Sequence, residues 1–227
     1  NLLALEPDER ISAVIPIREY EEGKFLLMCT KAGVIKKTDL MEYKNAPAGG
    51  KIAIRLDEGD ELIQVSLTDG TNDIFIGSHL GKMIRFNEKD VRTMGRVSRG
   101  VRGMNLENGD YVIGMSLACE DGKMLVVSEK GYGKKTELSE YKTQTRGGKG
   151  LKNYNITAKT GKVAGCRVVQ DTDDVMLIEN GGVIIRVPAN SINVYKRDVQ
   201  GVIIMRIEEG NQLVSLERVE AIAEETE

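Results

Sequence analysis

Basic side chains gather in four segments of the chain that hold few acids. Residues 91–104 contain four arginines and no Asp or Glu, and residues 141–157 contain four basic side chains and again no acid. Such segments bind a phosphate backbone electrostatically, without reading the bases. The predicted phosphate contacts are Arg92, Arg96, Arg99, Arg102, Lys142, Arg146, Lys149, Lys152, Lys196 and Arg197, with Lys44 and Lys51 in the first segment. We therefore expect an extended polyanion as the ligand.

A further basic residue recurs four positions after a glycine in each quarter of the chain. These residues are Lys37, Arg85, Lys135 and Arg186. They are phosphate contacts of second rank, because a structural role on a strand explains them equally well. In the third basic segment, Gly147 and Gly148 stand beside the cations, where they would let a phosphate approach backbone N–H groups, as in anion-binding nests.

The sequence offers little for catalysis or metal binding. Its three cysteines and single histidine form no CxxC pair and no metal-ligand cluster. Residues 147–150 lack the spacing and the Ser or Thr of a nucleotide-binding P-loop. We expect a non-catalytic domain with no metal, no cofactor and no small-molecule substrate. The net charge of −3 argues against nucleic acid, but the clustering of the cations outweighs it.

The basic segments recur because the chain repeats a unit of about 50 residues four times. One glycine anchor is Gly33, Gly81, Gly131 and Gly182, and a second is Gly50, Gly100, Gly150 and Gly201. Repeats of this length indicate stacked or radially arranged units, which cannot bury their apolar faces alone. We predict a single domain over residues 1–227, with repeats at about 8–56, 60–106, 110–156 and 161–207 and partial units at 1–5 and 210–219.

Short apolar runs bounded by turn residues predict four strands per unit. The predicted first strands are 8–16, 60–67, 110–117 and 161–169, and the second strands are 25–30, 74–78, 124–128 and 175–178. The third strands are 34–38, 82–86, 132–136 and 183–187, and the fourth strands are 51–56, 101–106, 151–156 and 202–207. Such units in tandem predict an all-β, propeller-like fold. The basic segments between third and fourth strands would then lie on one edge.

The chain shows no signal for a membrane or for export. It has no run of 18 or more apolar residues, and residues 1–5 lack the pattern of a signal peptide. We expect a cytoplasmic protein. Residues 1–5 align with fourth strands and residues 210–219 with first strands, so the ends are out of phase with the repeat. We interpret the chain as a fragment of a larger protein.

Residues 141–150, YKTQTRGGKG, resemble the glycine- and arginine-rich box of the DNA gyrase A subunit, usually written QRRGGKG. The sequences GYGKKT at 131–136, GVRG at 100–103 and QGVI at 200–203 also resemble the C-terminal domain of that subunit. The resemblance covers essentially the whole chain. Two features depart from the family pattern. Thr145 stands where Arg is usual. Family members carry the box in their first blade, whereas here it lies in a later unit, and of that first blade we expect only the last strand in this chain.

The resemblance implies a β-pinwheel, a propeller-like disc in which neighbouring blades exchange strands. It also implies sequence-independent DNA bending and wrapping on the outer rim, in support of ATP-dependent negative supercoiling by the whole type IIA topoisomerase. The implied partners are duplex DNA and, in a heterotetramer at the nucleoid, the gyrase B subunit together with the rest of the gyrase A subunit. ATP and Mg²⁺ would be used by other parts of that enzyme. Two alternatives stay open: the C-terminal domain of topoisomerase IV, and a β-propeller scaffold that binds proteins.

Overall fold

The computed structural model describes residues 9–47 and 49–219, and these residues form an all-β fold. The strands are β1 (Phe25–Thr30), β2 (Val34–Asp39), β3 (Leu62–Thr68), β4 (Asp73–Ser78), β5 (Lys82–Asn87), β6 (Val101–Arg102), β7 (Val112–Leu117), β8 (Lys123–Ser128), β9 (Tyr132–Glu137), β10 (Leu151–Lys152), β11 (Val163–Val169), β12 (Asp174–Glu179), β13 (Ile184–Pro188), β14 (Val202–Ile203) and β15 (Leu213–Val219). Short 3₁₀ turns follow four of them: η1 (Leu40–Tyr43), η2 (Glu88–Asp90), η3 (Leu138–Glu140) and η4 (Ala189–Ser191). None of the helical segments in this part of the chain could reach across a membrane.

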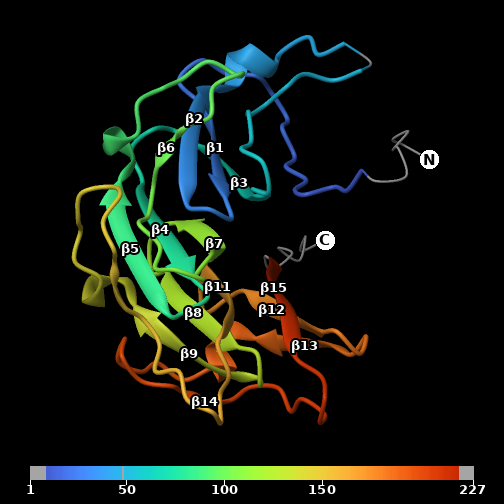
Figure 1. The fold of residues 1–227 in the computed structure, drawn as a ribbon, viewed down its shortest axis with the longest axis vertical. Helices are drawn as coiled ribbons and strands as arrows, with labels where there is room; N and C mark the ends of the chain where they lie inside the picture. The colour runs from blue at the N-terminus through green and yellow to red at the C-terminus, as the bar shows by residue number, and fades with distance from the viewer. Residues whose placement is uncertain (1–8, 48, 220–227) are drawn as a thin grey trace, which may run out of the picture.

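Four antiparallel sheets follow one another around an arc, which confirms the predicted propeller-like architecture (Figure 1). Their strand orders are β3-β1-β2-β6, β10-β5-β4-β7, β11-β8-β9-β14 and β13-β12-β15. Strands β3, β7, β11 and β15 lie toward the inner side of the arc in Figure 1, and β2, β5 and β9 lie toward the outer side. The outer side is therefore where a third strand ends and a basic segment begins.

Neighbouring units exchange strands. The hairpin of β1 and β2 is completed by β3 and β6, which both come from the following unit and pair as Phe25↔Thr68 and Val34↔Arg102. The same rule brings β7 and β10 to the second hairpin and β11 and β14 to the third. The exchange implied by the family resemblance is confirmed. The four strands of one sequence unit consequently do not form one sheet.

Two predicted strands of the first unit do not form. Residues 9–16 and 51–56 have no strand structure. By the exchange rule, their partners would be a second and a third strand that precede residue 24, and the described residues contain no strand there. The predicted partial unit at 1–5 lies outside the described residues. The remaining fourth strands are only two residues long, because the chain then turns inward to bury Met104, Tyr154 and Met205.

The apolar core fills the spaces between successive sheets. Leu27 and Ile35 of the first sheet cluster with Ile74 and Ile84 of the second, and all four are fully buried. Removing apolar area from water contributes roughly 25 cal/mol per Å². Each sheet therefore depends on its neighbour for stability, as expected for repeats that cannot fold singly.

The second glycine anchor marks the point where an exchanged fourth strand touches a third strand. Gly150 has a φ of +72°, and a β carbon on it would stand 2.6 Å from the carbonyl oxygen of Met83. Gly50 has a similar φ of +75° but nothing within 4 Å of that position. We expect Gly150→Ala to lower the free energy of unfolding by about 2–4 kcal/mol and Gly50→Ala by about 1 kcal/mol. Urea denaturation measures both, and equal losses would contradict the close-approach explanation.

Candidate nucleic-acid interface

Each basic loop lies against the outer third strand of the preceding sheet. The loop of the second unit bonds to β2 through the Met94 amide, which donates to the Lys37 carbonyl at 2.8 Å. At the equivalent places, Gln144 donates to Arg85 of β5 at 2.7 Å and Tyr195 donates to Lys135 of β9 at 2.8 Å. These backbone bonds fix the loops on the rim of the arc. The fold thus displays the same loop at three successive outer edges.

The loops are also joined to one another, so that they form one continuous surface. The backbone amides of Arg55, Asn105 and Asn155 donate to the carbonyls of Ser98, Gly148 and Val199 at 3.2, 2.9 and 3.4 Å. Each bond links the end of one loop to the middle of the next. We call this surface, made of residues 49–55, 92–105, 142–155 and 193–203, the basic belt. It brings all four predicted basic segments together.

Three arginines at equivalent positions strengthen these links. Nη1 of Arg96 donates to the Ile52 carbonyl at 3.1 Å, and Nη1 of Arg146 donates to the Arg102 carbonyl at 2.5 Å. Arg197 makes the same bond to the Lys152 carbonyl. Arg146 bonds in addition to the Asp90 carbonyl through Nε, at 3.2 Å. The sequence predicted these arginines as phosphate contacts. In the structure each one hydrogen-bonds to a carbonyl of the neighbouring loop, and we call this inter-loop bond a clasp.

The belt leaves several cations exposed to solvent. In the described part of the chain, no ion pair engages Arg92, Arg102, Lys142, Lys149 or Lys196, and all five are exposed, as is Lys44 beside the belt. Arg99 pairs with Asp57 at 2.7 Å, with both side chains more than half exposed. Lys152 donates to Asn155, and Lys51 donates to the carbonyls of Glu42 and Lys44. The exposed cations carry most of the charge available to a polyanion.

Gly147 and Gly148 of the box both make backbone hydrogen bonds to the preceding unit. The amide of Gly147 donates to the Gly103 carbonyl at 2.8 Å, and the Gly148 carbonyl accepts from Asn105. Because its N–H is already bonded, Gly147 cannot offer it to a phosphate. Its φ of +81° makes the turn that brings the loop back onto the preceding unit. Gly147 therefore helps to shape the belt, and the role predicted for Gly148 toward a phosphate stays a prediction.

Of the second-rank candidates on the third strands, Lys37, Arg85 and Lys135 make structural contacts, which corrects their assignment as phosphate contacts. Lys37 is buried against Glu88, and Lys135 is buried with its Nζ 2.5 Å from Asp171. The Lys135 and Lys123 ammonium groups lower the pKa of the Asp171 carboxyl. Arg85 pairs with Asp73 at 2.7 Å and bonds to the carbonyls of Leu138 and Tyr141, where the next loop begins. Arg186 pairs with Asp174 at 2.6 Å but keeps an exposed side chain.

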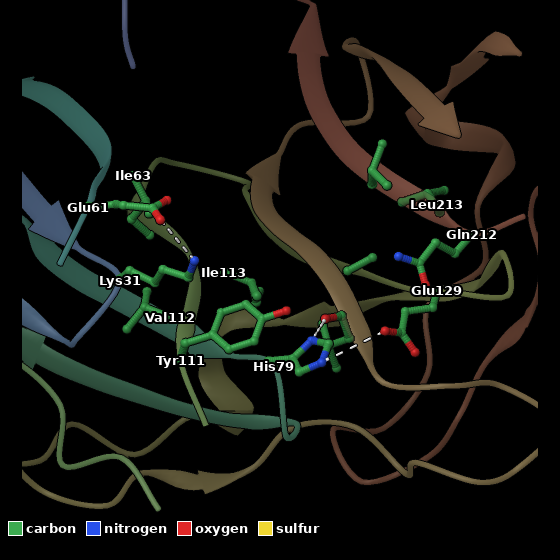
Figure 2. A pocket seen from close by; sticks show the side chains of 13 residues that line it. Lys31, Glu61, Ile63, His79, Tyr111, Val112, Ile113, Glu129, Gln212 and Leu213 are labelled. Carbon is green, nitrogen blue, oxygen red and sulfur yellow. Dashed lines mark hydrogen bonds and ion pairs between the residues drawn. The ribbon is translucent and has the colours of Figure 1, made fainter. Parts of the chain in front are cut away.

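A pocket of about 270 Å³ lies among the turns at the starts of the inner strands (Figure 2). The ring of His79 stacks on Tyr111 with centroids 4.4 Å apart, and its Nδ1 lies 2.8 Å from the Val163 carbonyl. Its Nε2 lies 3.8 Å from a Glu129 oxygen, an acidic neighbour that the sequence did not reveal. Lys31 pairs with Glu61 at 3.2 Å on one side of the same pocket. These contacts join turns of successive units, so His79 has a structural role at this junction.

The family of the chain follows from its match to a family model. The model described as DNA gyrase C-terminal domain, beta-propeller, matches residues 24–69, 72–119, 122–170 and 173–220. The chain belongs to this DNA gyrase C-terminal domain family. Each matched segment begins just before a second strand, so it follows the hairpins of the sheets. The gyrase-family assignment agrees with the box at residues 141–150.

Relatives and solved structures support the assignment. The chain is 42% identical over 219 residues to the DNA gyrase A subunit of Salmonella typhimurium and 47% identical to that of Clostridium acetobutylicum, in each case over 96% of its own length. It spans about a quarter of the length of these relatives, at 25% and 26%. Among solved structures, it resembles the C-terminal domain of DNA topoisomerase IV, with a TM-score of 0.89 and 31% identity, covering 96% of this chain and 68% of that one. It also resembles the DNA gyrase A C-terminal domain, with a TM-score of 0.86 and 26% identity, covering 96% and 73%.

Proposed function

We propose that this gyrase-family domain binds duplex DNA without sequence preference along the basic belt, and bends and wraps the DNA there. The observation that carries the proposal is the continuity of the belt, whose loops are bonded end to middle along the outer side of the arc. A rigid curved row of cations favours a polyanion that follows the curve. Contacts to phosphates position a protein on DNA but carry no sequence information.

The charge distribution explains how a chain of net charge −3 can bind DNA. The exposed cations of the belt face solvent together, whereas acids such as Glu58, Asp60 and Asp110 lie in the turns before inner strands. Because screening at physiological salt limits interactions to about 8 Å, DNA on the belt would respond mainly to the cations beneath it. Local charge therefore matters more than net charge.

We further propose that the domain serves a whole DNA gyrase. In that enzyme it would hand a wrapped DNA segment to the remaining parts of the gyrase A subunit, which would form a heterotetramer with gyrase B in the cytoplasm. Wrapping with one handedness would bias strand passage toward negative supercoils. ATP and Mg²⁺ would act elsewhere in the assembly, and the domain itself would cut no DNA. The role is tested by replacing the equivalent region of a gyrase A subunit with this chain and assaying the resulting enzyme. We expect that enzyme to retain negative supercoiling.

Binding to duplexes across a salt series tests the DNA interface itself. With about eight phosphates neutralised, the affinity should fall about 10⁴-fold between 50 and 200 mM salt. Unrelated sequences of equal length should bind alike, and longer duplexes should bind more tightly because they reach more of the belt. Fluorescence anisotropy with duplexes of increasing length measures all three effects. A strong preference for one DNA sequence, or an affinity that does not change with salt concentration, would contradict the proposal.

A role in topoisomerase IV is the second candidate, favoured by the TM-score of 0.89 to its C-terminal domain. The gyrase A relatives of 42% and 47% identity and the preserved residues 146–150 favour gyrase. The exchange experiment separates the two roles, since a topoisomerase IV domain should support relaxation without negative supercoiling. A protein-binding scaffold would instead need apolar hot spots on the rim. The belt exposes Ile52, Val97, Val194, Val202 and Ile203, but exposed cations outnumber them.

A further inference from the structure

Two lysines beneath the basic belt have no place in the proposed binding surface. Lys36 of β2 and Lys134 of β9 occupy equivalent positions, three residues after the first glycine anchor, and both are fully buried. Burying an ammonium group is costly unless it is hydrogen-bonded. The partners of these two groups therefore indicate why lysine stands there.

Both ammonium groups are bonded to main-chain carbonyls of the belt loops. Nζ of Lys36 donates to the Ala53 carbonyl at 2.6 Å and to the Arg96 carbonyl. Nζ of Lys134 donates to the carbonyls of Lys196 and Arg197 at 2.8 and 2.5 Å. The carbonyls of Arg96 and Arg197 thus point inward, while their side chains clasp the neighbouring loop.

The other two units supply a natural comparison. At the position of these lysines they carry Ile84 and Ile185. The loop above Ile84 contains Gly147, whose amide donates to the Gly103 carbonyl at 2.8 Å. The equivalent carbonyl above Lys36 belongs to Ala53, and it accepts from Nζ of Lys36 instead. The loops above Lys36 and Lys134 have Val97-Ser98 and Asp198-Val199 at the place of Gly147-Gly148. The two belt loops that lack the equivalent of Gly147 are therefore held from below by a buried ammonium group.

We propose that Lys36 and Lys134 are positioning residues whose buried ammonium groups hold two loops of the basic belt in the shape that meets DNA. The inference rests on the proposed DNA-binding function and deepens it. It also adds two fixed positive charges directly behind the surface that faces the phosphates. DNA on the belt should favour the charged form of both groups.

Protonation of these lysines is adjustable near physiological pH. Burial lowers the pKa of Lys36 to about 8, with a smaller contribution from Arg96. Burial likewise lowers the pKa of Lys134 to about 8, where Arg197 acts in the same direction and Glu140 and Asp198 oppose it. Around Lys36, Glu42 faces Arg96 at 3.7 Å, and the Tyr43 hydroxyl donates to the same Ala53 carbonyl. Each ammonium group should therefore lose its proton as the pH rises from 7 to 9.

The sign of the stability effect is opposite to that of the binding effect. Both pKa values lie below the 10.5 of a free lysine, so the unfolded chain binds more protons between about pH 8 and 10.5. The free energy of unfolding contributed by these groups therefore rises with pH in that window. A loss of DNA affinity at pH 9 could not then be attributed to their weakening the fold.

The test compares DNA affinity at pH 7 and pH 9 for the full chain and for Lys36→Ile with Lys134→Ile, which copies the residues of the other two units. The probe is a duplex long enough to reach all belt loops, at constant ionic strength. We expect the unmodified chain to lose affinity about five- to tenfold between the two pH values, as for the loss of one to two charges near phosphates. The double variant should bind more weakly at pH 7 and show no such fall. Lys142 is an exposed lysine of the belt, and Lys142→Ala serves as a control. Relative to the unmodified chain, this variant should lose the same factor of affinity at pH 7 and at pH 9.

The inference would be overturned if the double variant bound DNA at pH 7 as tightly as the unmodified chain. It would also be overturned if the double variant lost as much DNA affinity between pH 7 and pH 9 as the unmodified chain does. If the double variant does not fold, proton uptake decides the question in the unmodified chain. Calorimetry at pH 8.5 in two buffers of different ionisation enthalpy should show protons taken up when DNA binds, and no uptake contradicts the inference. Failure of the unmodified chain to bind DNA at pH 7 and 50 mM salt would instead remove the proposed function itself, together with everything built on it.

Discussion

Replacing Arg102, Lys142 and Lys149 together by alanine is expected to weaken binding to a long duplex about 100-fold at 150 mM salt. The three side chains are exposed on adjacent loops of the belt, so each can release a condensed counterion from the DNA. Each lost contact removes about 0.9 from the slope of log affinity against log salt, so the slope should flatten by about 3. Fluorescence anisotropy over a salt series measures the affinity and the slope.

A matched triple variant controls for the loss of net charge. Lys130, Lys159 and Lys162 are also exposed lysines, but they lie in turns outside the belt. Replacing them by alanine should leave the slope unchanged and alter the affinity less than about threefold. If both triple variants lose the same affinity, binding follows net charge and the belt has no special role.

Arg146→Met is expected to lower the free energy of unfolding by about 2–3 kcal/mol, a large effect for a partly exposed side chain. The change removes the donor for the carbonyls of Arg102 and Asp90, at 2.5 and 3.2 Å, and it opens the link between two loops. Urea denaturation measures the stability. Since the loops would no longer be held in register, affinity for a long duplex should fall more than affinity for a duplex that covers one loop.

Arg102→Met is the control for the clasp, because it removes the same charge from an exposed arginine of the neighbouring loop. Its stability should change by less than about 0.5 kcal/mol, while its affinity should fall about fivefold on duplexes of every length. Identical behaviour of the two variants in stability and in length dependence would show that Arg146 contacts phosphates only.

The strands were predictable because hydrophobic periodicity is a local property of the sequence. The second and third strands match the predicted ranges to within one or two residues, as for residues 25–30 against β1 (Phe25–Thr30). Residues 9–16 and 51–56 were predicted from the same kind of pattern, yet they form no strand. A strand needs a partner for its backbone groups, and the partner of each lies in another unit. The pattern of apolar residues in a segment shows that the segment could form a strand. Only the tertiary structure shows whether a neighbouring strand is there to pair with it.

The sequence by itself determined the repeat, the all-β class and the sign of the charge on one edge, because glycine spacing and charge can be counted along the chain. Only the tertiary structure decided which cations are exposed on the belt and which are buried beneath it. The sequence left open whether Lys37 and Lys135 contact phosphates, and the structure buries both of them together with their neighbours Lys36 and Lys134. Arg146 looks like a phosphate ligand, yet it donates to a carbonyl 44 residues away. A side chain's role depends on the partners that strand exchange brings to it, and those partners belong to neighbouring units.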